Sequence, residues 1–176
     1  ASVESAARFV NDLSTAVGDE KWHYFLSPFL ETPVFPQNTV PGAVNGALGI
    51  GVLATGVDEA FFEKYKEEWS TEPLDGTYFY YDAAALTMLS LARMFHLEGS
   101  YSKDGFNDAI VSVAYRQGIQ VKWNQLSQGL QYAASGTEIS YSGLSGPLLF
   151  DEGGQQQKAS VKYWTVQAGK VVDDAQ

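Results

Sequence analysis

The sequence predicts an α/β fold, and three observations lead to this prediction. Segments whose apolar residues recur at helical spacing alternate with short, apolar, β-leaning segments. Glycine and proline separate most of these segments. The candidate strands are too few to cover the apolar faces of so many helices. We therefore expect a parallel sheet flanked by helices that is incomplete in this chain.

The first elements follow from spacing and punctuation. Apolar residues at helical spacing predict a helix over residues 3–17, with Gly18 as its stop. Residues 22–26 (WHYFL) are typical of a buried strand that ends at Ser27 and Pro28. Three prolines, Pro33, Pro36 and Pro41, predict an irregular or briefly helical stretch after it.

The middle of the chain combines a glycine-rich strand with two long helices. Residues 43–55 (AVNGALGIGVLAT) are β-leaning, with glycines where bulky neighbours can approach closely. Asp58 can cap a helix that runs to about Trp69. Glu72-Pro73 breaks that helix, and Thr77 or Asp75 can cap the next, over residues 78–96. Its middle section is apolar nearly all round, so we expect it to be buried.

The last third predicts two more helices and then strands. Helices are expected over residues 104–116 and 124–134, the second stopped at Gly136. Expected strands are 138–141, 147–150, and a hairpin of 160–167 with 170–172 around Ala168-Gly169. Between them, Gly146-Pro147 would set the entry of a strand, and Asp151 would form a turn.

Composition excludes several classes of function. Lys and Arg number 11 against 21 Asp and Glu, and this net charge of −10 disfavours a nucleic-acid partner. With no cysteine and only His23 and His96, we expect no metal site and no cofactor. The glycines at 46, 49 and 51 reverse the dinucleotide-binding spacing, and no helix start follows them.

No catalytic cluster is evident, so we expect no catalytic residue. A G-x-S-x-G pattern does not occur. The acidic pairs 151–152 and 173–174 fall in turn or tail contexts, which favours a solvated role. The aromatic run 78–81 favours core packing, with the alternative that one or two of its rings line a cleft. Ser27, Pro28 and Phe29 end a strand, where ligands bind in open α/β sheets.

The order of these motifs resembles a type I periplasmic binding protein. The closest subgroup is the branched-chain amino-acid (Leu/Ile/Val)-binding receptors of ABC transporters. The segments that carry the resemblance are WHYFLSP, residues 46–55, FFEKYKEEW, EPLDGTYFYYDAAAL, YSGLSGPLLFDEGG and VKYWTVQAGKVV. They span essentially the whole chain. The order and spacing of these segments together carry the resemblance.

The resemblance implies two α/β lobes joined by three crossings, with the chain matching only the C-terminal half. Residues 1–54 would belong to the second lobe, 55–157 to the first, and 158–176 would return to the second lobe. The missing N-terminal half would supply most of the first lobe's sheet. We expect the chain alone to self-associate or to bind that half. No apolar run approaches the ~20 residues of a membrane span, and a signal peptide is absent or removed.

The resemblance also places a ligand site. In amino-acid-binding members, a carboxylate after the second-lobe strand holds the ligand's ammonium group, and Phe29 occupies the corresponding place here. Either Glu31 substitutes for it, or the ligand is not a simple α-amino acid, which we favour because a buried ammonium needs a counter-charge. The candidate ligand-binding residues are Ser27, Phe29, Glu31 and Tyr78.

The function implied is that of a solute-binding component of an ABC importer. It would capture an amino acid, an amide or an aromatic or apolar acid in the periplasm or outside the cell. Anchoring to the membrane as a lipoprotein is an alternative that the sequence leaves open. The protein would deliver this ligand to a membrane permease. One alternative is a ligand-sensing domain of a signalling receptor or regulator. A second is a hydrolase that uses Asp82 or Glu31.

Overall fold

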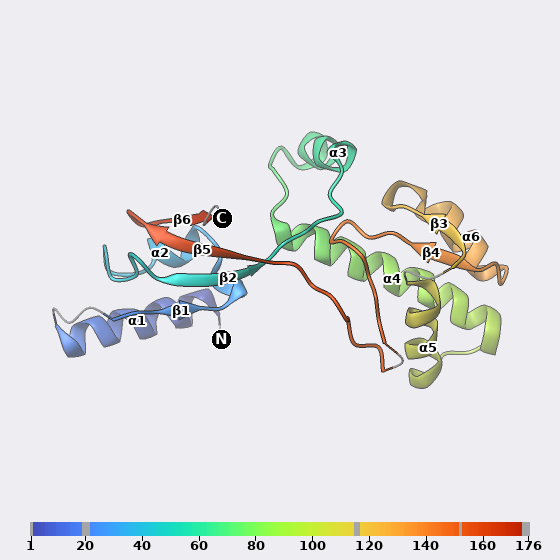
Figure 1. The fold of residues 1–176 in the computed structure, drawn as a ribbon, viewed down its shortest axis with the longest axis horizontal. Coiled ribbons are helices and arrows are strands. Elements are labelled where there is room, and N and C mark those ends of the chain that lie inside the picture. The colour runs from blue at the N-terminus through green and yellow to red at the C-terminus, as the bar shows by residue number, and fades with distance from the viewer. Residues whose placement is uncertain (1, 19–21, 115–116, 152, 174–176) are drawn as a thin grey trace. The chain divides into compact units, whose positions relative to one another are not determined.

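A computed structural model describes residues 2–18, 22–114, 117–151 and 153–173. The chain divides into two compact units (Figure 1). Unit 1 comprises residues 1–52 and 161–176, and unit 2 comprises residues 53–160. The chain therefore passes from one unit to the other twice, after residue 52 and after residue 160.

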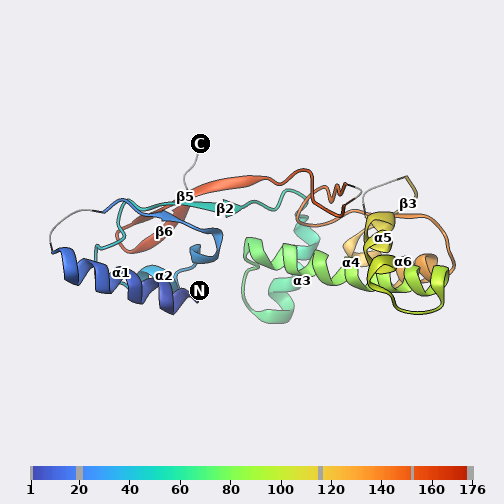
Figure 2. The ribbon, with the colours of Figure 1, turned by 90° about the horizontal axis from the view of Figure 1, so that it is seen from below.

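Unit 1 is built on a four-stranded mixed sheet in the order β1-β2-β5-β6. The strands are β1 (Phe25–Leu26), β2 (Leu48–Val52), β5 (Val161–Gln167) and β6 (Lys170–Asp173). Strand β1 pairs with β2 in parallel, and the other two pairings are antiparallel. Helices α1 (Val3–Val17) and α2 (Val34–Gln37) lie on the same side of the sheet (Figure 2).

The two faces of this sheet differ sharply. Side chains alternate between the faces of a strand. On the face toward α1 and α2, the fully buried Trp164 packs with Val10 and Phe35 in one core. The pairing register places an apolar set on the opposite face, and its exposed members are Phe25, Leu48, Val161, Tyr163 and Val172. Both helices of unit 1, α1 and α2, lie on the other side of its sheet (Figure 2).

Unit 2 is mainly helical. Its helices are α3 (Glu59–Trp69), α4 (Asp75–Glu98), α5 (Lys103–Val113) and α6 (Leu126–Ala134). Strands β3 (Ile119–Val121) and β4 (Ile139–Tyr141) form a two-stranded parallel sheet, and the 3-10 turn η2 (Trp123–Gln125) follows β3. The main core lies between α4, α5, α6 and this sheet, around Leu89, Ile139 and Tyr141. Two parallel strands with open edges make an incomplete sheet, as the sequence predicts.

Most predicted elements are confirmed. The first helix has the predicted bounds, with Gly18 at its C-cap, and the Asp58 side chain caps α3 by accepting from the Phe61 amide at 2.7 Å. The hairpin of β5 and β6 turns at Ala168 and Gly169, both with positive φ. The predicted helix end at Arg116 lies outside the described residues.

Three predictions of local structure need correction, and one strand was missed. Residues 147–150 form no strand, and only an isolated bridge joins Phe150 to Gln156. The first strand is confined to Phe25–Leu26. Helix α4 begins after Leu74, whose amide donates to the Thr77 hydroxyl at 3.2 Å, rather than after Thr77 or Asp75. Strand β3 was not anticipated.

In the described residues, none of the helices combines the length and the apolar character needed to cross a membrane.

Candidate functional site

Three of the four candidate ligand-binding residues lie together in unit 1, just after β1. Ser27 precedes the 3-10 turn η1 (Pro28–Leu30), and its carbonyl accepts from the Leu30 amide at 3.0 Å. Proline in the first position suits the start of such a turn, since its missing N–H would be unpaired there. The Phe29 ring is 81% exposed. The turn thus presents an aromatic face at the carboxyl end of a parallel strand.

Glu31 follows the turn and is held by unit 1 itself. Its Oε1 lies 2.7 Å from the Lys162 Nζ, and both side chains are mostly buried. Lys162 also donates to both carboxylate oxygens of Asp173, at 3.1 and 3.2 Å. The Glu31 carboxylate packs where a Cβ on Gly51 of β2 would stand, so a larger residue there would displace it from this position. Glu31 therefore fastens η1 to β2 and β5, and a lysine already pairs with its carboxylate.

Tyr78, the fourth candidate residue, lies in unit 2 and is only 5% exposed. Its ring packs against Phe61 of α3, with ring centroids 5.5 Å apart. Burial raises the pKa of the Tyr78 hydroxyl, and the nearby Asp75 charge adds to this effect. The other three residues of the aromatic run line cavities. Phe79 lines one cavity, and Tyr80 and Tyr81 line another. A role for Tyr78 in ligand binding stays a prediction.

Asp82 holds the loop that follows β4. Its carboxylate accepts four hydrogen bonds, from the Tyr141 hydroxyl (2.8 Å), the Leu144 amide (3.0 Å), the Ser145 amide (2.7 Å) and the Ser145 hydroxyl (2.6 Å). The residue is 2% exposed. Burial, and then the Asp82 charge, raise the pKa of Tyr141 far above its usual range, so this phenol stays a donor. With its lone pairs engaged, Asp82 positions a loop rather than offering a free base.

The loop that Asp82 holds lines a cavity of about 630 Å³ in unit 2. Ser145, Gly146 and Pro147 form one wall, Phe79 forms another, and residues 156–160 close it. Just beside it, the Leu53 amide donates to the Ser160 carbonyl at 2.9 Å. The residues that follow β2 and those that precede β5 are therefore joined where they enter and leave unit 2.

The acidic turn and the glycines have structural roles. Asp151 Oδ1 accepts from the Gly153 and Gln155 amides, both at 2.9 Å, which confirms the predicted turn. Glu152 and Asp174, the other members of the two acidic pairs, lie outside the described residues. Gly49 faces the Trp164 indole, which confirms the predicted close approach of a bulky neighbour. Among the described residues, no group of three His, Asp or Glu side chains is placed to hold a metal ion.

Comparison with known proteins identifies the fold. No protein-family model and no curated protein matches the sequence. Among solved structures, the leucine-binding protein LivK of Thermotoga maritima matches 99% of this chain with a TM-score of 0.62 at 18% identity. A putative branched-chain amino acid ABC transporter protein of Rhodospirillum rubrum gives a TM-score of 0.52 at 16% identity and also covers 99% of this chain. LivJ of Streptococcus pneumoniae, solved with isoleucine, gives 0.56 at 15% identity and the same coverage.

These identities are low, so the likeness is one of fold. The chain has the fold of the type I periplasmic binding proteins, as its sequence resemblance implies. It spans 42% of LivK and of the Rhodospirillum protein, and 43% of LivJ. The fold is therefore present only in part.

The sequence did not reveal the pairing of Glu31 with Lys162 or the role of Asp82. Glu31 and Lys162 come from distant parts of the chain, and no local pattern links them. The four donors to Asp82 lie 59 to 63 residues further along the chain. A local signal did exist in YSGLSG, whose small residues are typical of a tight loop.

Proposed function

We propose that this chain is part of an extracytoplasmic solute-binding protein of an ABC importer, which captures a small ligand without chemical change. The observation that carries the proposal is the partial type I binding-protein fold, with an exposed aromatic turn at the carboxyl end of β1. In open α/β sheets this is where ligands bind. The resemblance implies that residues 1–54 and 158–176 belong to one lobe and 55–157 to the other.

The state of Glu31 supports a ligand other than a simple α-amino acid. Lys162 already pairs with the Glu31 carboxylate, so a ligand ammonium would have to compete with a mostly buried cation. Phe29 offers an apolar, planar face instead. We therefore propose an amide or an aromatic or apolar acid as the ligand, bound through Phe29 and Ser27, with Glu31 as a positioning residue.

A ligand screen tests this function. We expect an aromatic acid, such as phenylacetate, to raise the melting temperature and to be recovered unchanged. At a hundredfold excess over Kd, the added stability is about 2.7 kcal/mol. Phe29→Ala should weaken binding about tenfold, since an aromatic contact contributes roughly 1.5 kcal/mol. Phe9→Ala is the matched control, because Phe9 is also an exposed phenylalanine of unit 1.

Formation of a product from the ligand would contradict the proposal and favour the hydrolase. If Phe29→Ala binds the ligand with the same affinity as the unchanged protein, Phe29 is not part of the site.

The uncovered sheet face of unit 1 supports the partners we propose. In a doubly covered α/β sheet, helices bury both faces. Here Phe25, Leu48, Val161, Tyr163 and Val172 leave one face apolar and exposed. We propose that further protein, either the N-terminal half or a second copy, covers this face, and that the complete protein docks on a membrane permease.

Light scattering tests whether this face associates. We expect the chain alone to give an average mass above that of a monomer, rising with concentration. Tyr163→Lys should shift the population toward the monomer, because a charge on an apolar contact face opposes association. Phe9→Lys on α1 should leave the mass unchanged. A monodisperse monomer at every concentration would contradict the expectation.

A further inference from the structure

Unit 2 contains an aromatic groove that lies apart from every predicted site residue except the buried Tyr78. The groove has a volume of about 550 Å³ and lies between α3, the start of α4, and η2. Six aromatic residues line it: Phe61, Tyr65, Trp69, Tyr80, Tyr81 and Trp123. We call this set the aromatic groove. Its size falls within the range of ordinary small-molecule clefts, which are also mostly apolar.

The walls of the groove are fixed by hydrogen bonds rather than by packing alone. Asp58 accepts from the Phe61 amide through Oδ1 and from the Trp123 Nε1 through Oδ2, both at 2.7 Å. The Tyr81 hydroxyl donates to the Trp123 carbonyl at 2.8 Å. These bonds join η2 to α3 and to α4. A cleft whose walls are already in place loses little entropy when a ligand enters.

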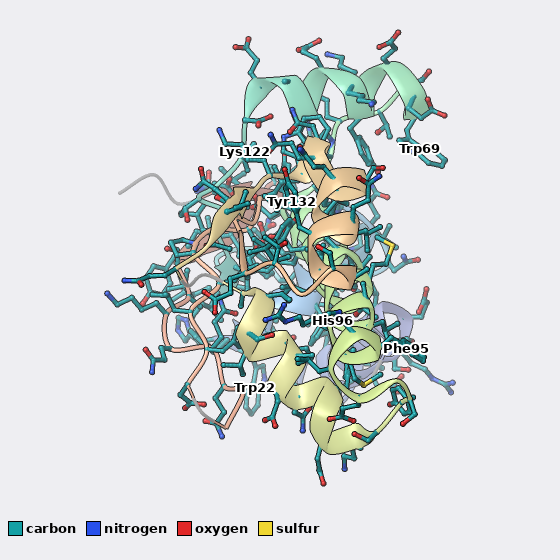
Figure 3. The ribbon with its side chains drawn as sticks, turned by 90° about the vertical axis from the view of Figure 1, so that its right-hand side faces the viewer. Trp22, Trp69, Phe95, His96, Lys122 and Tyr132 are labelled. Carbon is teal, nitrogen blue, oxygen red and sulfur yellow. The ribbon has the colours of Figure 1, made fainter. Side chains whose placement is uncertain are left out.

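The rings provide flat faces for a planar ligand. Phe61 forms the floor, with Tyr81 and Trp123 nearly perpendicular to it at centroid distances of 5.1 and 5.2 Å. Tyr65 and Trp69 continue the wall along α3, with centroids 6.4 Å apart. Trp69 and Tyr80 are 66% and 75% exposed, so their faces are accessible. Figure 3 shows Trp69 at the C-terminal end of α3, extending from the helix.

Charge narrows the class of ligand. The groove is lined by one cation, Lys64, and one anion, Glu68, one helical turn apart. Their charges balance, so the lining favours neither an anion nor a cation. Offset stacking on tyrosine and tryptophan rewards a flat aromatic ring. We propose that the aromatic groove is a binding site for an uncharged, planar aromatic compound, independent of the ligand site on Phe29.

Nitrogen-15 NMR of the tryptophan side chains tests this site with indole as the probe. The chain has four tryptophans, of which Trp69 and Trp123 line the groove and Trp22 and Trp164 belong to unit 1. We expect unlabelled indole to shift the indole N–H signals of the groove pair saturably. The signals of the unit 1 pair should stay in place, which gives an internal control.

Variants separate this site from the proposed ligand site. Trp69→Ala and Tyr80→Ala remove exposed rings, and each should weaken indole binding about tenfold. Phe29→Ala should leave it unchanged. If instead Phe29→Ala abolishes the shifts, the ligand binds in unit 1 and the groove proposal is overturned. If indole never shifts Trp69 and Trp123, the groove proposal fails, while the function proposed through Phe29 is unaffected.

Two further arms complete the test. Tryptamine and indole-3-acetate add a positive or a negative charge to the same ring, and both should bind more weakly than indole. Tighter binding of either one would overturn the assignment to an uncharged ring. A shift of the Trp69 and Trp123 signals on dilution without indole would mean that a second copy covers the groove, which would also overturn the proposal.

Discussion

Asp82→Ala should lower the stability of unit 2 far more than the substitution of any exposed residue. The substitution leaves the Tyr141 hydroxyl, the Leu144 amide and both donors of Ser145 buried around an empty acceptor position. Each buried donor left without an acceptor costs about 1–3 kcal/mol, so the four together cost roughly 4 kcal/mol or more. For a domain of about 100 residues, this lowers the melting temperature by roughly 15 °C or more. Differential scanning calorimetry measures the loss.

Two variants sharpen this test. Asp82→Asn keeps the shape but turns an NH2 group toward donors, so it should lose most of the same stability. Asp108→Ala removes an exposed carboxylate from the middle of α5 and should change stability by less than about 0.5 kcal/mol. If the unfolding free energy of Asp82→Ala lies within about 1 kcal/mol of that of the unchanged protein, Asp82 does not hold the loop after β4.

Gly49→Val should destabilise unit 1 by about 3 kcal/mol or more. A Cβ at Gly49 would overlap the indole of Trp164, which is fully buried and packed under α1 and α2. Overpacking a closed core typically costs 1–3 kcal/mol, and a ring enclosed by the sheet and the helices has little room to move. Urea unfolding followed by tryptophan circular dichroism measures the change.

A double-mutant cycle identifies the contact as the cause. Trp164→Phe makes space and costs no hydrogen bond in the described structure, because the Trp164 Nε1 is buried there without an acceptor. We expect Gly49→Ala and Trp164→Phe together to cost at least about 1 kcal/mol less than the sum of the two single changes. Gly76→Ala is the control, since a Cβ there lies 3.8 Å from the nearest atom, on Tyr80. Strict additivity would refute the steric account.

The elements that could be predicted are those with a local cause. The end of α1 at Gly18, the Asp58 cap of α3 and the hairpin at Gly169 each follow from one residue and its neighbours. Residues 147–150 were wrongly predicted to form a strand, because the cause of their apolar character is not local. Leu148 is apolar because it packs into the helical core of unit 2, and the segment joins no ladder. Strand β3 has only three residues, too few for an alternation to be visible.

The candidate site was predictable only where it is local. The turn of Ser27 and Phe29 follows from a strand that ends at a proline. The partner of Glu31 is set by tertiary structure, since β2, η1 and β5 bring it to Lys162 across the sheet. The aromatic groove had a partial signal in FFEKYKEEW and TYFYYD. The hydrogen bonds that shape it, from the Trp123 indole to Asp58 and from the Tyr81 hydroxyl to the Trp123 carbonyl, span long stretches of chain.

Isothermal titration calorimetry of the chain with phenylacetate tests the central claim most directly. A binding protein gives heat only until its site is full, and an enzyme continues to release or absorb heat while substrate remains. We predict a saturable, single-site isotherm with a flat baseline, weakened about tenfold by Phe29→Ala. A steady heat signal that persists after saturation would show turnover and contradict the account.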